Sequence, residues 1–550
     1  MHTPTRRTLL SASIMAAGSG LLGACSGTDS HSGPQSARGP GGRGHHRFVP
    51  EGPKGYVNPS DPEVLATERE RDGGPVRFYR FTAEETTIDL GGPTVRSWAY
   101  GHTAPGRPVR VTAGDILSLT LANRLPVSTT LHSHGVRLRC DMDGVPGLTQ
   151  EGVEPGSEFD YRFTVSYPGT YLLHSHLGMQ LDRGLFAPLI VDDPKEPLSY
   201  DKEWIVVLDD WVDGVDGSTP DGVLRQLHRG KRPPPSMDMG GESQHGGSAG
   251  RHAPYGRTAA APGGSGGGPI RVLGDTHSDV LDGMGGNVAY PHYLINGRVP
   301  TAPTSFHARP GDRIRLRIIN AGGDTAFRVA LGDHTLTVTH TDGYPVEHCE
   351  TDALLIGMAE RYDVVFTAKD GTFPLVAVAE GKQRGAGALA VLRTSKSRGL
   401  PGPSVRPDEL DGRIMPARRM TPDESVALND DREPDRQIRI RATGNMRDYN
   451  WMFDHRPYSV AQRHPIRQGE RVRLTLINGT DMWHPLHLHG HTFALTGLGD
   501  LGARKDTAIV LPHRKLVVDF DADNPGLWML HCHNQYHSES GMMTILGYRK

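Results

Sequence analysis

Short runs of alternating apolar and polar residues recur along this chain, and Gly, Pro, Asn and Asp separate them. Because successive side chains of a strand point to opposite faces, this period of two predicts half-buried β-strands. No long stretch shows a convincing helical period. Many short strands divided by turns favour β-sandwiches, so we predict an all-β fold.

One strand pattern occurs three times. Each copy begins with Gly and an acidic residue, continues as an alternating strand and ends at Asn, and the copies span residues 114–123, 311–320 and 469–478. Their domain-like spacing predicts three related units. We place unit one, unit two and unit three at residues 76–195, 196–395 and 436–550.

Two internal segments have a loose composition. Residues 231–268 are rich in Gly, Ser, His and Pro, which predicts a disordered insertion in unit two. Its Met237, Met239 and histidines could instead capture a metal ion. Residues 396–435 are rich in Pro, Arg and Asp, and we interpret them as the linker into unit three.

The N-terminus has the pattern of an export signal, which we place at residues 1–25. Arg6 and Arg7 form a twin arginine before a mild apolar run that is too short to span a membrane. The segment ending at Cys25 resembles a lipobox, so the mature chain is expected outside the cytoplasm, touching the membrane only through a lipid on Cys25. The alternative is a plain secretory signal with an incidental cysteine. Residues 26–75 are expected to form a flexible tether.

Composition narrows the function. The 550 residues carry a formal net charge of −3, which argues against a nucleic-acid partner. Four cysteines are too few for a disulfide scaffold of this size. Cys140 and Cys349 lie outside every other motif, and an oxidising compartment would allow a disulfide between units one and two. Buried free thiols are the alternative.

Histidine pairs of the form His-x-His occur four times, twice in unit one and twice in unit three. They are His132/His134, His174/His176, His487/His489 and His531/His533. Two histidines at i and i+2 on a strand share a face, so each pair can present two imidazoles to one metal cluster. Eight imidazoles are too many for one ion. The pattern therefore predicts a cluster of several metal ions between units one and three.

A second ligand set follows the spacing Cys-x4-His-x4-Met, at Cys532, His537 and Met542. Thiolate, imidazole and a weak thioether are the ligands of copper sites that transfer electrons. His484, three residues before His487, would supply a second imidazole.

Cys532 stands between His531 and His533. On a strand the cysteine would point to one side and both histidines to the other. One segment can then hold a copper on each side, joined by covalent bonds. That arrangement suits the passage of electrons between two metal centres.

Together, these motifs resemble those of the three-domain bacterial multicopper oxidases, the laccase-like family, over roughly residues 76–549. The resemblance implies three cupredoxin-like Greek-key β-sandwich domains and four copper ions. A type 1 copper would be held by His484, Cys532 and His537, with Met542 axial. A type 2 copper would be held by His132 and His487. Two type 3 coppers would be held by His134, His174, His176, His489, His531 and His533. Residues 143–150 and 360–364 are further family-like stretches.

Members of this family take single electrons from a donor at the type 1 copper and reduce dioxygen to water at the trinuclear cluster. The resemblance therefore implies an oxidase of phenols or aromatic amines. An oxidase of Cu(I), Mn(II) or Fe(II), acting for instance in copper tolerance, is one alternative. A copper-binding protein without turnover is another, disfavoured because all twelve ligand positions are filled.

Reduction of dioxygen also consumes protons. Asp143 follows the first His-x-His pair, where the family places an acidic residue, so we expect it to relay protons or to support a ligand. A carboxylate that stabilises a Gly turn is the alternative. Many bacterial relatives carry Glu directly after the histidine of the copper loop. Here Ser538 occupies that position, and Glu539 is the candidate for a second proton path.

Overall fold

The computed structural model describes residues 48–71, 73–229, 269–274, 276–395, 399–428, 432–496 and 501–550. The expected export signal with Cys25, and all of the expected insertion at 231–268, lie outside these ranges. Residues 48–71 were expected to belong to a flexible tether. They instead contain α1 (Pro62–Glu70), and Tyr56, Val57 and Val64 are buried.

Within the described ranges the strands form six sheets, and the all-β prediction is confirmed. In unit one, the first sheet has the order β2 (Thr94–Tyr100), β1 (Val76–Asp89), β4 (Ile116–Asn123), β6 (Glu158–Thr164). The second has the order β3 (Val109–Thr112), β8 (Phe186–Asp192), β7 (Gly169–His174), β5 (His132–His134). Two short 3-10 turns accompany them, η1 (Cys140–Met142) and η2 (Leu181–Arg183).

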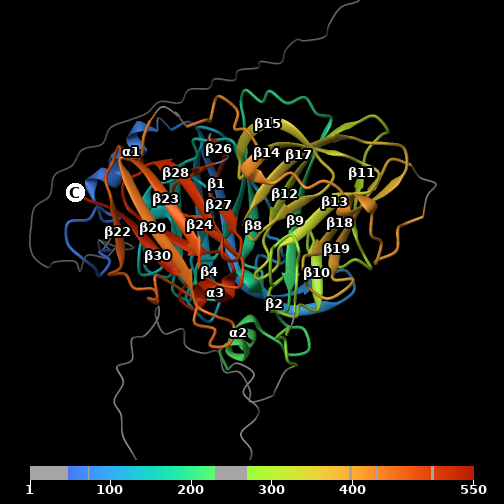
Figure 1. Cartoon of the computed structure of the whole chain (residues 1–550), viewed down its shortest axis with the longest axis horizontal. Helices are drawn as coiled ribbons and strands as arrows, with labels where there is room; N and C mark the ends of the chain where they lie inside the picture. Colours follow the sequence, from blue (N-terminus) through green and yellow to red (C-terminus); the bar gives the residue numbers. More distant parts are fainter. Residues whose placement is uncertain are drawn as a thin grey trace, which may run out of the picture. The chain divides into compact units, whose positions relative to one another are not determined.

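Units two and three each contain two sheets, and each of these sheets has more strands than the sheets of unit one (Figure 1). In unit two, the first has the order β10 (His292–Ile295), β9 (Lys202–Trp211), β12 (Arg313–Asn320), β17 (Arg361–Thr367), β14 (Leu336–Thr341), β15 (Tyr344–Thr351). The second has the order β11 (Thr304–His307), β19 (Gly387–Arg393), β18 (Thr372–Ala379), β13 (Phe327–Leu331), β16 (Leu354–Ile356). In unit three, the first has the order β21 (Met452–Phe453), β20 (Arg436–Thr443), β23 (Arg471–Asn478), β28 (Lys515–Asp521), β25 (Phe493–Thr496), β26 (Leu501–Lys505). The second has the order β22 (Arg463–Ile466), β30 (Met543–Tyr548), β29 (Leu527–Cys532), β24 (His484–Leu488), β27 (Thr507–Val510).

The repeated sequence pattern forms the same strand in each unit, namely β4, β12 and β23. Each pairs in parallel with the strand that opens its unit, β1, β9 or β20. The terminal Asn of each copy has the same role. The side-chain amide of Asn123 donates to two backbone carbonyls, one in the loop that follows and one in a segment farther along the chain. Asn320 and Asn478 each form the same two kinds of hydrogen bond. The repeat thus combines a strand with a side-chain lock at its end.

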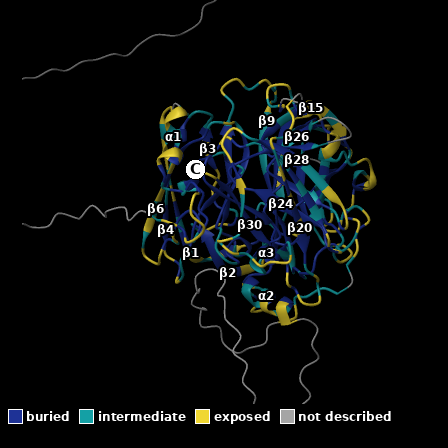
Figure 2. Cartoon of the chain, turned by 60° about the vertical axis from the view of Figure 1, so that its left-hand side comes forward, coloured by how far each residue is buried: buried dark blue, intermediate teal, exposed yellow. Residues whose placement is uncertain are grey.

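The short helices were not expected from the sequence. Besides α1, the described chain contains α2 (Pro220–Arg229) and α3 (Gln535–Glu539), with two 3-10 turns, η3 (Asp408–Asp411) and η4 (Ala417–Arg419). Figure 2 shows exposed residues on α1 and α2, whereas the strands around β24 and β30 are buried. In the described part of the chain, no helix is long and apolar enough to cross a membrane.

Candidate metal centre

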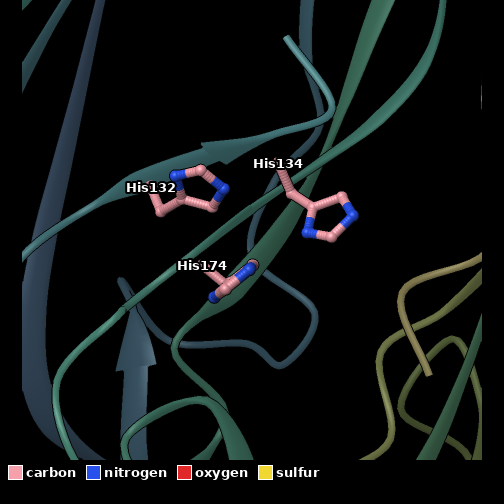
Figure 3. A group of neighbouring side chains, drawn as sticks. All are labelled: His132, His134 and His174. Atoms are coloured by element: carbon pink, nitrogen blue, oxygen red, sulfur yellow. The ribbon is translucent and has the colours of Figure 1, made fainter. Parts of the chain in front are cut away.

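Four strands, two from unit one and two from unit three, carry the histidine pairs to one place. β5 pairs with β7 so that His132 lies opposite His174, and β24 pairs with β29 so that His487 lies opposite His531. Figure 3 shows His132 and His134 on one strand and His174 on its neighbour. Among the described residues, the histidines of this group all come from units one and three.

Six of the eight rings form two triads. In the first triad the ring centroids are between 4.9 and 5.7 Å apart, and its members are His134, His174 and His533. In the second the distances are 4.9 to 5.1 Å, and its members are His176, His489 and His531. The remaining rings, of His132 and His487, lie 5.8 Å apart. Each triad and the pair combine histidines from both units.

The hydrogen bonds of the rings test whether metal ions fit. Nδ1 of His132, His174 and His487 lies 2.7 to 2.9 Å from the backbone carbonyls of Asp143, Ser175 and Asp506 respectively. A carbonyl can only accept, so each Nδ1 carries the proton and each Nε2 keeps its lone pair. Nε2 of these three rings is buried and has no hydrogen-bond partner among the described residues. Unpaired imidazole nitrogens in one buried place are the donor set of a metal cluster.

His134 is turned the other way. Its Nε2 lies 3.0 Å from both the Asp506 carboxylate and the Thr507 hydroxyl. Its Nδ1 is the buried nitrogen that has no partner in the described structure. His134 therefore offers Nδ1, whereas His132, His174 and His487 offer Nε2.

Burial also keeps the rings in the form that binds metal. Loss of solvent lowers the pKa of six of these histidines well below the ordinary value, in His134, His174, His176, His489, His531 and His533. A neutral imidazole is the ligand form of histidine, so the cluster needs no deprotonation before it binds a cation.

The second predicted ligand set is equally close. Nδ1 of His484 and Nδ1 of His537 lie 3.2 Å apart, and Sγ of Cys532 lies 3.6 and 3.7 Å from them. Burial lowers the pKa of His537 to about 3 and raises the pKa of the Cys532 thiol. The side chain of Met542 is buried, and its backbone carbonyl accepts from the Cys532 N–H at 3.1 Å. Two imidazoles and a thiol at this spacing fit one copper ion.

Asn534 holds the segment from Cys532 to Met542, which we call the copper loop. The sequence did not indicate this role of Asn534. Its side-chain oxygen accepts from the backbone N–H groups of Tyr536 and His537, so it caps α3. Its amide donates to Asp324 of unit two at 2.6 Å. Asp324 in turn pairs with Lys382. Unit two thus supports the copper loop without supplying a ligand.

The two predicted proton-relay residues lie in different surroundings. Asp143 is fully buried, and its carboxylate lies 2.9 Å from Nδ1 of His489 and 3.2 Å from Nδ1 of His132. Glu539 lies on α3, where burial raises its pKa to about 7 and Asp221 of α2 is its charged neighbour. Among the described residues, Glu539 has no contact with the eight cluster histidines.

Asp506 was also missed, because nothing near it in the sequence resembles a motif. It lies between β26 and β27 and contacts His134 through its carboxylate and His487 through its carbonyl. A signal existed in the family-like stretch 360–364, whose Arg361 forms two hydrogen bonds with the Asp506 carboxylate, at 2.7 and 2.6 Å.

Cys140 and Cys349 are free thiols in this structure, so the disulfide between units one and two is not formed. Cys140 is buried against unit three instead, and its Sγ lies 3.4 Å from the Leu527 carbonyl. Among the described residues, the groups of three or more His, Cys, Asp and Glu side chains that could hold a metal ion all lie in the two sites above.

Comparison with known sequences agrees with the two metal sites described above. Family models described as multicopper oxidase match residues 82–196, 275–397 and 431–549. The multicopper oxidase MmcO of Mycobacterium tuberculosis is 46% identical over 469 residues, which are 85% of this chain and 86% of that protein. A copper resistance protein A homolog of Pseudomonas syringae pv. tomato is 28% identical, over 87% of this chain and 93% of its own length. The L-ascorbate oxidase of Cucurbita maxima is 26% identical, over 88% and 92%.

Solved structures agree in fold. Fet3p, described as a multicopper oxidase that functions in iron import, superposes with a TM-score of 0.68 at 23% identity, covering 86% of this chain and 90% of that one. The laccase from Botrytis aclada gives 0.66 at 24% identity, covering 87% and 88%. The predicted cupredoxin-like sandwich fold is confirmed.

Proposed function

Because this chain belongs to the multicopper oxidase family, we propose that its two ligand sets hold four copper ions in the division that the side chains suggest. The enzyme is a copper-dependent oxidoreductase with dioxygen as acceptor. Its three units, at residues 76–195, 196–395 and 436–550, are the proposed domains. The pairs of sheets described above support this division.

The type 1 copper is assigned to His484, Cys532 and His537, with Met542 axial. The short distances between the two Nδ1 atoms and Sγ support this assignment. The two ring triads are assigned to the two type 3 coppers, and His132 with His487 to the type 2 copper. The observation that carries the proposal is the unpaired, buried ring nitrogen found in five of these histidines, namely His132, His134, His174, His487 and His533.

When bound, the coppers supply one-electron transfer at the type 1 site and four-electron reduction of dioxygen to water at the cluster. The chain supplies the connection between the two sites. Cys532 is bonded directly to His531 and His533, and its carbonyl accepts from Nδ1 of His531 at 2.9 Å. Four donors lose one electron each, and one dioxygen takes up four electrons and four protons.

The donor site is shaped by what covers His537. This ring is fully buried beneath Trp451, whose centroid lies 4.4 Å away, and Tyr449, at 6.0 Å. The exposed His228 of α2 lies over Tyr449, with the ring centroids 5.7 Å apart. Trp451 and Tyr449 are themselves buried, so the exposed ring of this group is that of His228. We propose small phenols and aromatic amines as donors, which can approach His228 and release one electron at a time.

A cuprous-ion oxidase that acts in copper tolerance is the second candidate. It is favoured by the similarity to copper resistance proteins, which are 28% identical to this chain. Met237 and Met239 lie outside the described residues and add no structural support. Steady-state rates with a phenol and with Cu(I) separate the two candidates, because each predicts a higher kcat/KM for its own donor.

We propose that Asp143 orients His489 through its carboxylate and His132 through its backbone carbonyl, and that the carboxylate passes protons to the cluster. Its hydrogen bonds with both rings support this role. Glu539 stays the proposed group of a second proton path, and its place on α3 beside Asp221 of α2 supports this role.

We also propose that the chain is exported by its twin-arginine signal and anchored through a lipid on Cys25. The sequence pattern at residues 5–25 supports this, and it lies outside the described residues. Metabolic labelling with a fatty acid tests it. Label on the wild-type protein that Cys25→Ser removes supports the anchor, and an unlabelled wild-type protein excludes it.

The decisive experiment is dioxygen uptake by the copper-loaded protein with a phenolic donor, with its visible spectrum recorded first. We expect a strong blue band, and uptake that Cys532→Ser abolishes. Cys349→Ser is the matched control, because this half-buried thiol lies outside both sites and should change neither result. Absence of the blue band at full copper loading would refute the type 1 assignment. A blue band without uptake of dioxygen would keep the type 1 assignment and would indicate the wrong donor or an incomplete cluster.

A further inference from the structure

The described residues of unit two include no proposed copper ligand, yet one of their side chains reaches the edge of the histidine cluster. Arg361 is the first residue of β17 and is fully buried. Its guanidinium forms two hydrogen bonds with the carboxylate of Asp506 in unit three, at 2.7 and 2.6 Å. This two-pronged geometry fixes both the position and the plane of the carboxylate.

The remaining N–H groups of Arg361 are used as well. Nε donates to the carbonyl of Thr170 in unit one at 3.0 Å, Nη1 to that of Ala359 at 3.0 Å, and Nη2 to that of Asp342 at 3.1 Å. A guanidinium has five N–H groups, and all five have an acceptor here among the described residues. Lysine has three donors without a fixed plane, so it cannot reproduce this arrangement.

The far side of Asp506 contacts the cluster. One carboxylate oxygen accepts from Nε2 of His134 at 3.0 Å, and its backbone carbonyl accepts from Nδ1 of His487 at 2.9 Å. An ionised carboxylate can only accept, so His134 must be protonated on Nε2. That tautomer is the one that leaves Nδ1 free to face the other rings.

The chain leaves room for this ion pair directly beside His134. Gly135 has a φ of 82°, in the left-handed region. A Cβ at Gly135 would lie 2.3 Å from Nη2 of Arg361 and 2.5 Å from the Asp506 carboxylate. A residue with a side chain at this position would therefore displace the pair. The ion pair between Arg361 and Asp506 therefore requires glycine in the turn after His134.

Asp506 belongs to a network of buried charged groups. Its backbone N–H, and that of Thr507, donate to the Asp342 carboxylate at 3.2 Å each. Lys505 pairs with Asp342 at 3.1 Å and with Glu360 at 3.2 Å. Buried charges persist only when they are paired and hydrogen-bonded, so the loss of one partner leaves another uncompensated.

We propose that Arg361 is a positioning residue for the trinuclear copper cluster, through which unit two sets the tautomer of His134 and the place of His487. Arg361 acts on Asp506, and Asp506 acts on the two rings. The proposal rests on the proposed function, because it assumes that these rings bind copper. Its test separates the two, since the histidine tautomer is measured in the protein without copper.

The test uses Arg361→Gln, Arg361→Lys and Asp506→Asn, with Arg317→Gln as the matched control. Arg317 is equally buried in unit two, pairs with Asp363 and contacts Thr170, but among the described residues it forms no hydrogen bond or ion pair with a cluster histidine. Two readouts are required. The first is the ring ¹⁵N NMR signature of His134 in the copper-free protein. The second is copper content with optical and EPR spectra after loading.

In the wild-type and Arg317→Gln proteins we expect His134 to be protonated on Nε2 and four coppers to bind. In both Arg361 variants we expect a mixture of tautomers and a loss of type 2 and type 3 copper signals, with the blue type 1 band retained. Affinity of the cluster for copper should fall by about 10- to 100-fold, as is typical when a group that orients a metal ligand is removed. Asp506→Asn keeps the size of the side chain and should give the same loss.

The proposal is overturned if Arg361→Gln retains the Nε2-protonated His134 and a complete cluster. It is also overturned if Arg317→Gln loses the cluster to the same degree, because the effect would then be one of folding alone. If Arg361→Gln cannot be purified folded, Asp506→Asn decides the matter by the same two readouts. Failure of the wild-type protein to bind four coppers would instead refute the proposed function.

Discussion

The carboxylate of Asp143 lies 2.9 Å from Nδ1 of His489, although 346 positions separate the two residues in the chain. Asp143 belongs to unit one and His489 to unit three, so this hydrogen bond crosses the junction where the cluster forms. The same carboxylate lies 3.2 Å from Nδ1 of His132, the partner of His487 in the proposed type 2 site. Asp143 therefore orients rings from both units.

Asp143→Ala is expected to lower kcat for dioxygen uptake by about 10- to 100-fold, because His489 loses the carboxylate that orients it, whereas His132 keeps the backbone carbonyl of residue 143. The type 1 band should keep its intensity, since Asp143 does not contact the copper loop. Asp141→Ala is the control, because Asp141 pairs with Arg139 instead. An unchanged kcat in Asp143→Ala would exclude a role for this carboxylate in the reaction.

The histidine pairs and the copper loop could be predicted from the sequence because each is local. Residues two apart on a strand share a face whatever the fold, and Cys532, His537 and Met542 belong to one loop. The supporting groups are not local. Asp506 meets His134 across 372 positions and Arg361 across 145. Such contacts depend on how the units pack, which no periodicity reveals.

The fold could likewise be predicted where it depends on local patterns, and could not be predicted where it depends on packing. Strict alternation identified β4, β12 and β23, and their common Asn suggested three related units. Helix α2 was missed although Val223, Leu224 and Leu227 have helical spacing, because so short an element competes with the surrounding turns. The packing of α1 was missed because its sequence has only one fully buried apolar residue, Val64.

Met542→Leu is expected to raise the reduction potential of the type 1 copper. Leucine lacks the weak axial thioether, which stabilises the oxidised ion. Potentiometric titration of the blue band measures the change. Met529→Leu is a suitable control, because Met529 is equally buried in β29 but lies outside the ligand spacing. An unchanged potential in Met542→Leu would exclude Met542 as the axial ligand.

Asn534→Ala should loosen the copper loop. It removes the cap of α3 and the hydrogen bond to Asp324, and loss of a cap alone costs about 1 kcal/mol. We expect faster loss of the blue band when the loaded protein is dialysed against a chelator. Asn445→Ala removes a similar turn hydrogen bond at an exposed site and should leave that rate unchanged. Equal rates in both variants would show that Asn534 does not hold the loop.

Cys140 and Cys349 are expected to remain separate thiols in the purified protein. Cys140 is fixed against the Leu527 backbone, and burial raises the pKa of its thiol, so the reactive thiolate is scarce. Peptide mapping after alkylation without reductant should find both cysteines alkylated individually once the protein is unfolded. A peptide containing Cys140 crosslinked to Cys349 would contradict the structure.

Asp213 gives a pH-dependent prediction away from the copper sites. Burial raises its pKa from 3.8 to about 6, although Arg183 and Ser97 contact the carboxylate. The folded state thus holds a proton that the unfolded chain releases between these values. The contribution of Asp213 to stability is complete below pH 3.8 and is lost as pH rises through 6.

The loss amounts to about 3 kcal/mol, at about 1.4 kcal/mol for each pKa unit. Asp213→Asn has no proton to release, so its free energy of unfolding relative to wild type should rise by about that amount between pH 4 and pH 7. Ser97→Ala removes a hydrogen bond that stabilises the carboxylate, so its stability should fall more steeply with pH than that of wild type. Urea unfolding of the copper-free proteins at several pH values measures both. Parallel curves for Asp213→Asn and wild type would mean that Asp213 releases its proton at the same pH in both states.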